Sequence, residues 1–175
     1  VFSPSGAKVS GGKVTDAGGT HVITEEVTII PTYDLWICGT QVTSTNKNDL
    51  SVIDGVSGTV TYDPGTLTLT LNGATISTTA DFVNSIRSEI DGLKVNLIGN
   101  NTVTSSSWAA IEFNQASTTI TGSGTLTVNN QTNSAIYVAG HDLGVSLTIK
   151  DCTLSATGGA CGIASYDDSE TLTID

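Results

Sequence analysis

The stretch that indicates the fold is residues 95–138, VNLIGNNTVTSSSWAAIEFNQASTTITGSGTLTVNNQTNSAIYV. It consists of short runs in which apolar and polar residues alternate, separated by turns rich in Gly, Asn and Ser, a pattern typical of β-strands. The runs come in sets of three, and the set recurs: Ile111 of one set is followed by Ile136 of the next, 25 residues later. The stretch therefore predicts a repeating all-β structure.

The same unit continues on both sides of this stretch. The first strand of each unit is expected at Leu69–Leu71, Val95–Leu97, Thr118–Ile120, Leu147–Ile149 and Leu172–Ile174. One unit has too few apolar residues to bury a core alone, so successive units must stack. The predicted fold is a right-handed parallel β-helix of about 25 residues per coil, with the handedness taken from the rule for crossover connections. An antiparallel β-sandwich is the alternative, but it does not require the same three-strand unit to recur in order.

Stacked coils should carry their apolar residues in three interior columns. The first column is expected to hold Leu71, Leu97, Ile120, Ile149 and Ile174. The second is expected to hold Ile76, Val103, Leu126 and Leu154. The third is expected to hold Ile86, Ile111, Ile136 and Ile163. Because side chains alternate along a strand, the residues next to these columns in the sequence should point outward.

Residues 1–65 do not follow the repeat, and we interpret them as an N-terminal β cap on the coils of residues 66–175. Asp63-Pro64-Gly65 is a turn signal and predicts a hairpin between the last cap strand and the first coil strand. The aromatic residues of the cap are expected in its core rather than on a ligand platform: Tyr33, Trp36 and Tyr62. The repeat runs into a strand at Thr171–Asp175, which predicts that further coils or another chain cover that end.

Composition and charge exclude several classes of protein. The chain has 175 residues, with 17 acidic against 6 basic residues and a net charge of −11, so phosphate neutralisation of a nucleic acid is not expected. No apolar run approaches the roughly 18 residues of a membrane helix. Few basic residues and many Thr and Asn favour an exported bacterial protein, extracellular or on the cell surface. Of the three cysteines, Cys152 falls in a turn and Cys161 is expected to be a buried free thiol.

The segment Tyr33–Ser44, YDLWICGTQVTS, together with Gly58–Pro64 and Leu69–Ile76, resembles a module in surface proteins of anaerobic, often gut-dwelling, bacteria. The coils that follow resemble the "carbohydrate-binding domain" family of cell-surface right-handed β-helices. One member of that family binds polygalacturonate and has calcium sites on the helix. The resemblance implies an extracellular, glycan-facing protein, and its motifs specify the fold better than the ligand.

The outward positions of the third strand of each coil form the leading candidate site. Arg87, Glu112 and Tyr137 occupy equivalent positions in successive coils, and Trp108 lies in the loop before this face. A tyrosine ring offers an apolar face to a sugar ring, and an arginine can bind a uronate carboxylate through two hydrogen bonds. These four residues are therefore predicted to bind an extended sugar chain. The alternative is a simple surface pair of Arg87 and Glu112, which would stabilise the protein by roughly 0–1 kcal/mol.

Two other features suggest weaker hypotheses. Thr75, Thr102, Thr125 and Thr153 are expected to stack in one outward column, as on the ice-binding face of insect β-helical antifreeze proteins; threonine is also an ordinary outer residue of strands. Asp167, Asp168 and Glu170 could bind calcium through their oxygens, or they could be a solvated acidic loop. No outward column places two acidic residues in adjacent coils, as a glycosidase would need.

Taken together, the sequence predicts a non-catalytic extracellular carbohydrate-binding module of a bacterial surface protein. A protein with so few basic side chains should hold an acidic polysaccharide only through a bridging cation such as calcium. The competing hypothesis is a structural or adhesive β-helical stalk that binds a host or cell-surface protein. A polysaccharide lyase or hydrolase and an ice-binding protein are the minor alternatives.

Overall fold

The structure is a computed structural model that describes residues 2–3, 6–10, 12–19, 21–22 and 28–175. The chain forms two compact units, one of Val1–Thr32 with Thr43–Thr45 and one of Tyr33–Val42 with Asn46–Asp175. The smaller unit contains two short antiparallel pairs: β1 (Phe2–Ser3) with β4 (Thr28–Ile29), and β2 (Lys8–Ser10) with β3 (Lys13–Thr15). In the described residues, no helix is long and apolar enough to cross a membrane.

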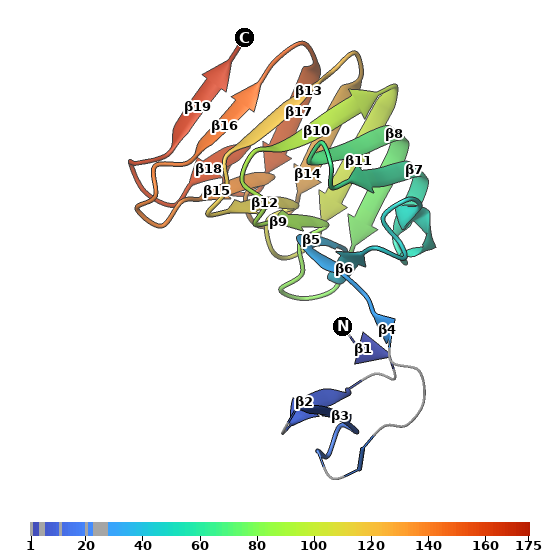
Figure 1. Ribbon diagram of the computed structural model, residues 1–175. Coiled ribbons are helices and arrows are strands. Elements are labelled where there is room, and N and C mark those ends of the chain that lie inside the picture. Colours follow the sequence, from blue (N-terminus) through green and yellow to red (C-terminus); the bar gives the residue numbers. More distant parts are fainter. Residues whose placement is uncertain (1, 4–5, 11, 20, 23–27) are drawn as a thin grey trace. The chain divides into compact units, whose positions relative to one another are not determined.

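The larger unit is a parallel β-helix of about four coils, which confirms the predicted fold (Figure 1). The first face contains β8 (Thr68–Thr78), β10 (Leu93–Ile98), β13 (Thr118–Gly122), β16 (Ser146–Ile149) and β19 (Thr171–Ile174). The second face continues from β8 through β11 (Asn100–Ser105), β14 (Thr125–Asn130) and β17 (Thr153–Gly158). The third face contains β9 (Ile86–Ser88), β12 (Ile111–Asn114), β15 (Ile136–Ala139) and β18 (Ile163–Ser165).

Strand β8 belongs to two faces because it bends in its middle. Its first half pairs with β10 and its second half with β11. The bend falls at Gly73, which has a φ of +57°, a left-handed conformation that glycine adopts without steric cost. The cap strand β7 (Val56–Asp63) follows the same bend, and there Gly58 approaches so closely that a Cβ would lie 2.3 Å from the carbonyl oxygen of Gly73.

The N-terminal end of the coils is covered by antiparallel strands. Strand β7 pairs along β8 through the predicted hairpin, and the 3-10 helix η1 (Leu50–Val52) packs on β7. On the third face, β5 (Thr32–Ile37) pairs antiparallel with β9, and β6 (Thr40–Thr43) lies beyond β5. Antiparallel strands are suited to this end because they satisfy the backbone of the first coil without extending the parallel stack.

The aromatic residues of the cap do not all lie in its core. Tyr62 is buried, and the ring of Tyr33 meets it edge to face with 5.2 Å between centroids, as predicted. The prediction for Trp36 is wrong: its side chain is half-buried and lies opposite Arg87 on the outer side of the third face. Alternation along β5 explains the difference, because the neighbouring Leu35 and Ile37 are the residues that fill the core.

The third interior column is confirmed, whereas the other two were predicted with an error of two residues. Ile111 pairs with Ile86 on one side and with Ile136 on the other, and Ile136 pairs with Ile163. The first face contains two columns where one was expected. One holds Leu69, Val95, Ile120, Ile149 and Ile174, and the other holds Leu71, Leu97 and Gly122. The second face also contains two columns. One holds Ile76, Val103, Val128 and Ala156, and the other holds Asn101, Leu126 and Leu154.

The error arises because Leu97 pairs with Gly122 on the first face and, on the second face, Leu126 pairs with a buried asparagine at the corner between the two faces. Asn101 is 1% exposed and occupies the interior position that Leu126 holds in the next coil. Its Oδ1 accepts a hydrogen bond from the backbone N–H of Ala74 at 2.9 Å. Its Nδ2 donates to the carbonyl oxygens of Ile98 at 3.2 Å and Thr125 at 3.1 Å. An apolar pattern misses this position because the corner fills its interior site with an amide instead of a hydrocarbon.

The three cysteines are free thiols. Cys161 is exposed, so the prediction that it is buried is wrong. It lies in the loop before β18, where the alternation of a strand does not apply, and the inward residue is Ile163, the first of the strand. Cys38 is half-buried, and desolvation raises the pKa of its thiol, which donates a hydrogen bond to the carbonyl oxygen of Ser77.

Candidate functional site

The outer side of the third face carries a row of large side chains, one from each of β9, β12 and β15. Arg87 on β9 pairs in register with Glu112 on β12, and Glu112 with Tyr137 on β15, as the sequence predicted. The row continues to Ala164 on β18 at one end. At the other end it begins with Trp36 on the antiparallel strand β5, which the sequence did not predict as a member.

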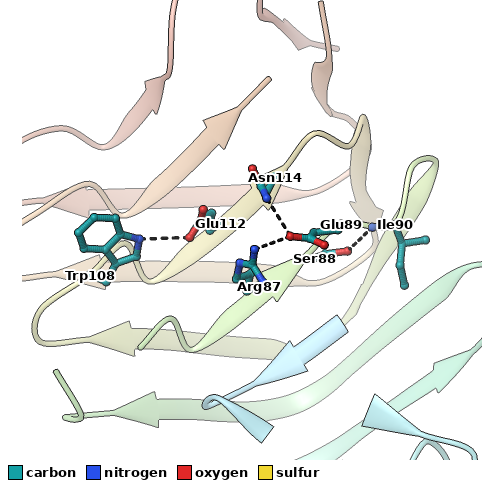
Figure 2. Close-up of polar contacts among 7 residues, drawn as sticks. All are labelled: Arg87, Ser88, Glu89, Ile90, Trp108, Glu112 and Asn114. Carbon is teal, nitrogen blue, oxygen red and sulfur yellow. Dashed lines mark hydrogen bonds and ion pairs between the residues drawn. The ribbon is translucent and has the colours of Figure 1, made fainter. Parts of the chain in front are cut away.

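Arg87 is held by neighbours of its own chain. Its guanidinium lies over the ring of Trp36, with Cζ 4.8 Å from the ring centroid, and it forms an ion pair with Glu89. Glu89 also accepts a hydrogen bond from Nδ2 of Asn114 at 2.8 Å (Figure 2). The partner of Arg87 is therefore Glu89 and not Glu112, and its charge is already compensated on the protein surface.

Glu112, Trp108 and Tyr137 meet in one place. Nε1 of Trp108 donates to Oε2 of Glu112 at 3.2 Å (Figure 2), which fixes the indole beside the row of the third face. A pocket of about 210 Å³ opens here, and it is lined by Trp108, Ala109, Asn133 and Tyr137. Two of the four predicted ligand-binding residues, Trp108 and Tyr137, thus line the pocket, Glu112 is hydrogen-bonded to one of them, and Arg87 is engaged elsewhere.

Buried asparagines from the neighbouring coils hold the loop that presents Trp108. Nδ2 of Asn84 donates to the carbonyl oxygen of Ala109 at 2.8 Å, from the coil before. Nδ2 of Asn130 donates to the carbonyl oxygen of Trp108, from the coil after, and its Oδ1 accepts the backbone N–H of Asn133 at 2.7 Å. Both asparagines are buried, so the walls of the pocket are fixed to the interior of the β-helix.

Phe82 adds a third aromatic ring that the sequence reasoning missed. It lies in the equivalent loop one coil earlier, and its ring centroid is 6.4 Å from that of Trp108. The side chain is 82% exposed, and its φ of +59° is left-handed, which is strained for a bulky residue. A strained, fully exposed phenylalanine contributes little to folding, which points to a role in binding. Its position 26 residues before Trp108 was the signal that could have identified it.

The electrostatic environment of the pocket is negative. The pKa of the Tyr137 phenol is raised, first by burial and then by Glu112, with smaller effects from Tyr166, Glu170 and Asp167. The cation nearest in register is Arg87, which is paired with Glu89. Carboxylates near one wall of this pocket are therefore not balanced by a free arginine of the third face.

The acidic loop predicted as a calcium site uses its carboxylates to order its own backbone. Hydrogen bonds from the Ser169 side chain and then from the Ser169 backbone N–H, at 2.8 Å, lower the pKa of Asp167 to about 2, and the backbone N–H of Asp142, at 3.3 Å, adds a smaller effect. Glu170 accepts from Gly140 at 2.6 Å and from Asp167 at 3.0 Å, whereas Asp168 is exposed. In the part of the chain that the structure describes, no three His, Cys, Asp or Glu side chains converge as a metal site would require.

The threonine column of the second face follows the corrected register. One outward column holds Thr75, Thr102, Thr127 and Ser155, and the neighbouring column holds Asn100, Thr125 and Thr153. The outward side of this face is still dominated by hydroxyl groups. The prediction of one column of four threonines is wrong, because the shift at the Asn101 corner moves Thr125 into the neighbouring column.

The C-terminal end of the coils is apolar. Strands β17, β18 and β19 are the last strands of their faces, and a pocket of about 580 Å³ opens between them. Leu154, Ile163 and Ile174 line it, and Ile174 is 70% exposed. This is the open end of the interior columns and not a site with chemistry of its own.

Comparisons with known proteins do not identify a ligand for this site. No family model matches the chain, and neither a curated protein nor a solved structure gives a significant match.

Proposed function

We propose that the protein is a non-catalytic carbohydrate-binding module that holds a glycan along the third face, outside the cell or on a bacterial cell surface. The observation that carries the proposal is the pocket between Trp108 and Tyr137, with Glu112 and Asn133 beside the two rings. Concave sites with aromatic walls and a few fixed polar groups are the usual form of small-ligand sites.

The chemistry of these residues suits sugar rings. Trp108 and Tyr137 offer flat apolar surfaces for the C–H faces of a sugar, and Asn133 and Glu112 offer hydrogen-bonding groups for its hydroxyls. Phe82 extends the aromatic surface to the preceding coil, so more than one ring of an oligosaccharide can be contacted. A binding role is favoured over catalysis because Glu112 has Arg87 and Tyr137, not a second carboxylate, as its neighbours in the row.

Affinity electrophoresis against a panel of soluble neutral, cationic and uronate polysaccharides tests the proposal, with calcium and then with a chelator. We expect retardation by at least one polysaccharide, and loss of that retardation in W108A and Y137A. The matched control is V52A, which removes an exposed apolar side chain from η1. Retardation that needs calcium would assign an acidic polysaccharide bridged by the metal. Unchanged migration of the wild type with every polysaccharide would overturn the proposal.

A structural or adhesive stalk is the second candidate, and the apolar C-terminal end of the coils favours it. Leu172 and Ile174 on β19 are 47% and 70% exposed, and the edge of β19 can pair with another parallel strand. In that case, the coils would project or bind a host or cell-surface protein. L172S combined with I174S should abolish such an interaction in a pull-down and leave glycan retardation unchanged.

A further inference from the structure

We propose that the pocket between Trp108 and Tyr137 selects amino sugars, whose rings carry an ammonium group, over neutral sugars and uronates. This inference rests on the proposed glycan-binding function and names its ligand class. It follows from three features of the site: the state of its single arginine, the carboxylates around it, and its aromatic walls.

The first feature is the lack of a free cation for a uronate. Arg87 is stacked on Trp36 and paired with Glu89, so a uronate would have to displace one carboxylate to reach the guanidinium. The lysines of the coils lie elsewhere: Lys94 is on β10 and Lys150 follows β16, both on the first face. A sugar carboxylate placed beside Tyr137 would therefore meet Glu112 without compensation, which disfavours binding.

The second feature is a carboxylate with unused capacity at the edge of the pocket. One oxygen of Glu112 accepts the indole N–H of Trp108, and a carboxylate has two oxygens that can each accept more than one hydrogen bond. Further negative charge comes from Glu170 and Asp167, whose influence reaches the Tyr137 phenol. Their bonds to backbone N–H groups fix their positions but leave their charges in place.

The third feature is the aromatic wall. A cation over the face of a tryptophan or tyrosine ring is attracted by the quadrupole of the ring, and the attraction grows when the cation is desolvated. Trp108 and Tyr137 line the same pocket of about 210 Å³, so an ammonium group there meets two rings, one of which is hydrogen-bonded to the Glu112 carboxylate. A neutral N-acetyl group at the same position retains the contact with the rings but loses both charge-dependent interactions.

The test is calorimetric titration of the wild-type chain with glucosamine oligosaccharides and with fully N-acetylated oligosaccharides of the same length and linkage. Oligogalacturonates, with calcium and with chelator, are the third ligand. We expect the amino form to bind at least about tenfold more tightly than the acetylated form, as one charge-assisted hydrogen bond implies. The difference should shrink as salt is added. Equal affinities of the two forms, or a preference for the uronate, would overturn the inference and leave glycan binding intact.

The variant E112Q separates charge from shape at the same site. We expect it to lose most of the preference for the amino form, because the amide still offers an acceptor to the indole N–H of Trp108 but carries no charge. D54N makes the same change of charge at an exposed turn after η1 and should keep the preference. Preference unchanged in E112Q would refute the assigned role of Glu112. If the wild-type protein bound none of the three oligosaccharides, this result would count against the proposed function as well.

Discussion

Replacement of Asn101 by alanine should strongly destabilise the β-helix, although the side chain is small and touches no ligand. The substitution removes the acceptor of the buried Ala74 N–H, which costs about 1–3 kcal/mol for an unsatisfied buried donor. It also removes the hydrogen bonds to the carbonyl oxygens of Ile98 and Thr125, which contribute about 0.5–1.5 kcal/mol each. We expect N101A to lower the free energy of unfolding by about 2–6 kcal/mol.

Urea denaturation followed by far-UV circular dichroism measures this effect, provided that the slope of the transition is the same in both proteins. The matched control is N100A, one residue earlier, where an exposed amide accepts a single hydrogen bond from Thr125. That change should cost no more than about 1 kcal/mol. If N101A and N100A unfolded at the same urea concentration, the hydrogen bonds of the Asn101 amide to the neighbouring coils would not be important for stability.

Three further predictions concern the backbone, the exposed aromatic residue and the acidic loop. G58A should destabilise the protein more than G73A in urea denaturation, because a Cβ at position 58 would lie 2.3 Å from the Gly73 carbonyl oxygen. A Cβ at position 73 would meet no atom within 4 Å, so G73A carries only the cost of a left-handed backbone, about 1–2 kcal/mol. Equal effects of the two substitutions would contradict the close approach at Gly58. F82G should leave the stability unchanged within about 1 kcal/mol, because relief of strain offsets the added freedom of the unfolded chain, yet it should weaken glycan retardation. The carboxyl of Asp167 should titrate near pH 2 by NMR and not at the usual value of about 3.9. Because the pKa of Asp167 is lowered in the folded protein, its contribution to stability is present above about pH 4 and is lost as the pH falls towards 2. A midpoint near pH 4 would count against the hydrogen bond from Ser169.

The sequence predicted the third face more accurately than the first two. There, an isoleucine begins the strand of every coil, and Ile86, Ile111 and Ile136 recur 25 residues apart, so aligning them gives the observed register. On the other two faces several strands offer two apolar residues two positions apart, such as Leu126 and Val128, and either can be aligned with the next coil without moving a side chain to the wrong side of the sheet. In the observed register, Leu97 pairs with Gly122 and Leu126 pairs with Asn101, and an apolar pattern marks neither of these partners.

The candidate site was predicted where strand register alone determines it and missed where loops or the cap contribute. Glu112 and Tyr137 follow from the repeat, because equivalent positions in adjacent coils must lie side by side. Phe82 was not found because its exposure depends on a left-handed backbone in a loop, and its place about one coil before Trp108 was the one periodic signal for it. Trp36 was placed in the core because an antiparallel strand at the edge of the third face cannot be derived from a parallel repeat.

The position of the pocket explains how such a protein can change its ligand without losing its fold. The interior columns fix the coils, and each coil meets its neighbours through the same paired strands. The loops between the second and third faces are tied to that interior by buried side chains such as Asn84 and Asn130. The loop residues between these hydrogen-bonded positions point outward and make few contacts with the core. The side chains at Phe82, Trp108 and Asn133 can therefore be replaced by others at little cost in stability. If glycan specificity lies in these loops, then exchanging one loop between coils should change the preferred sugar and leave the unfolding transition in place.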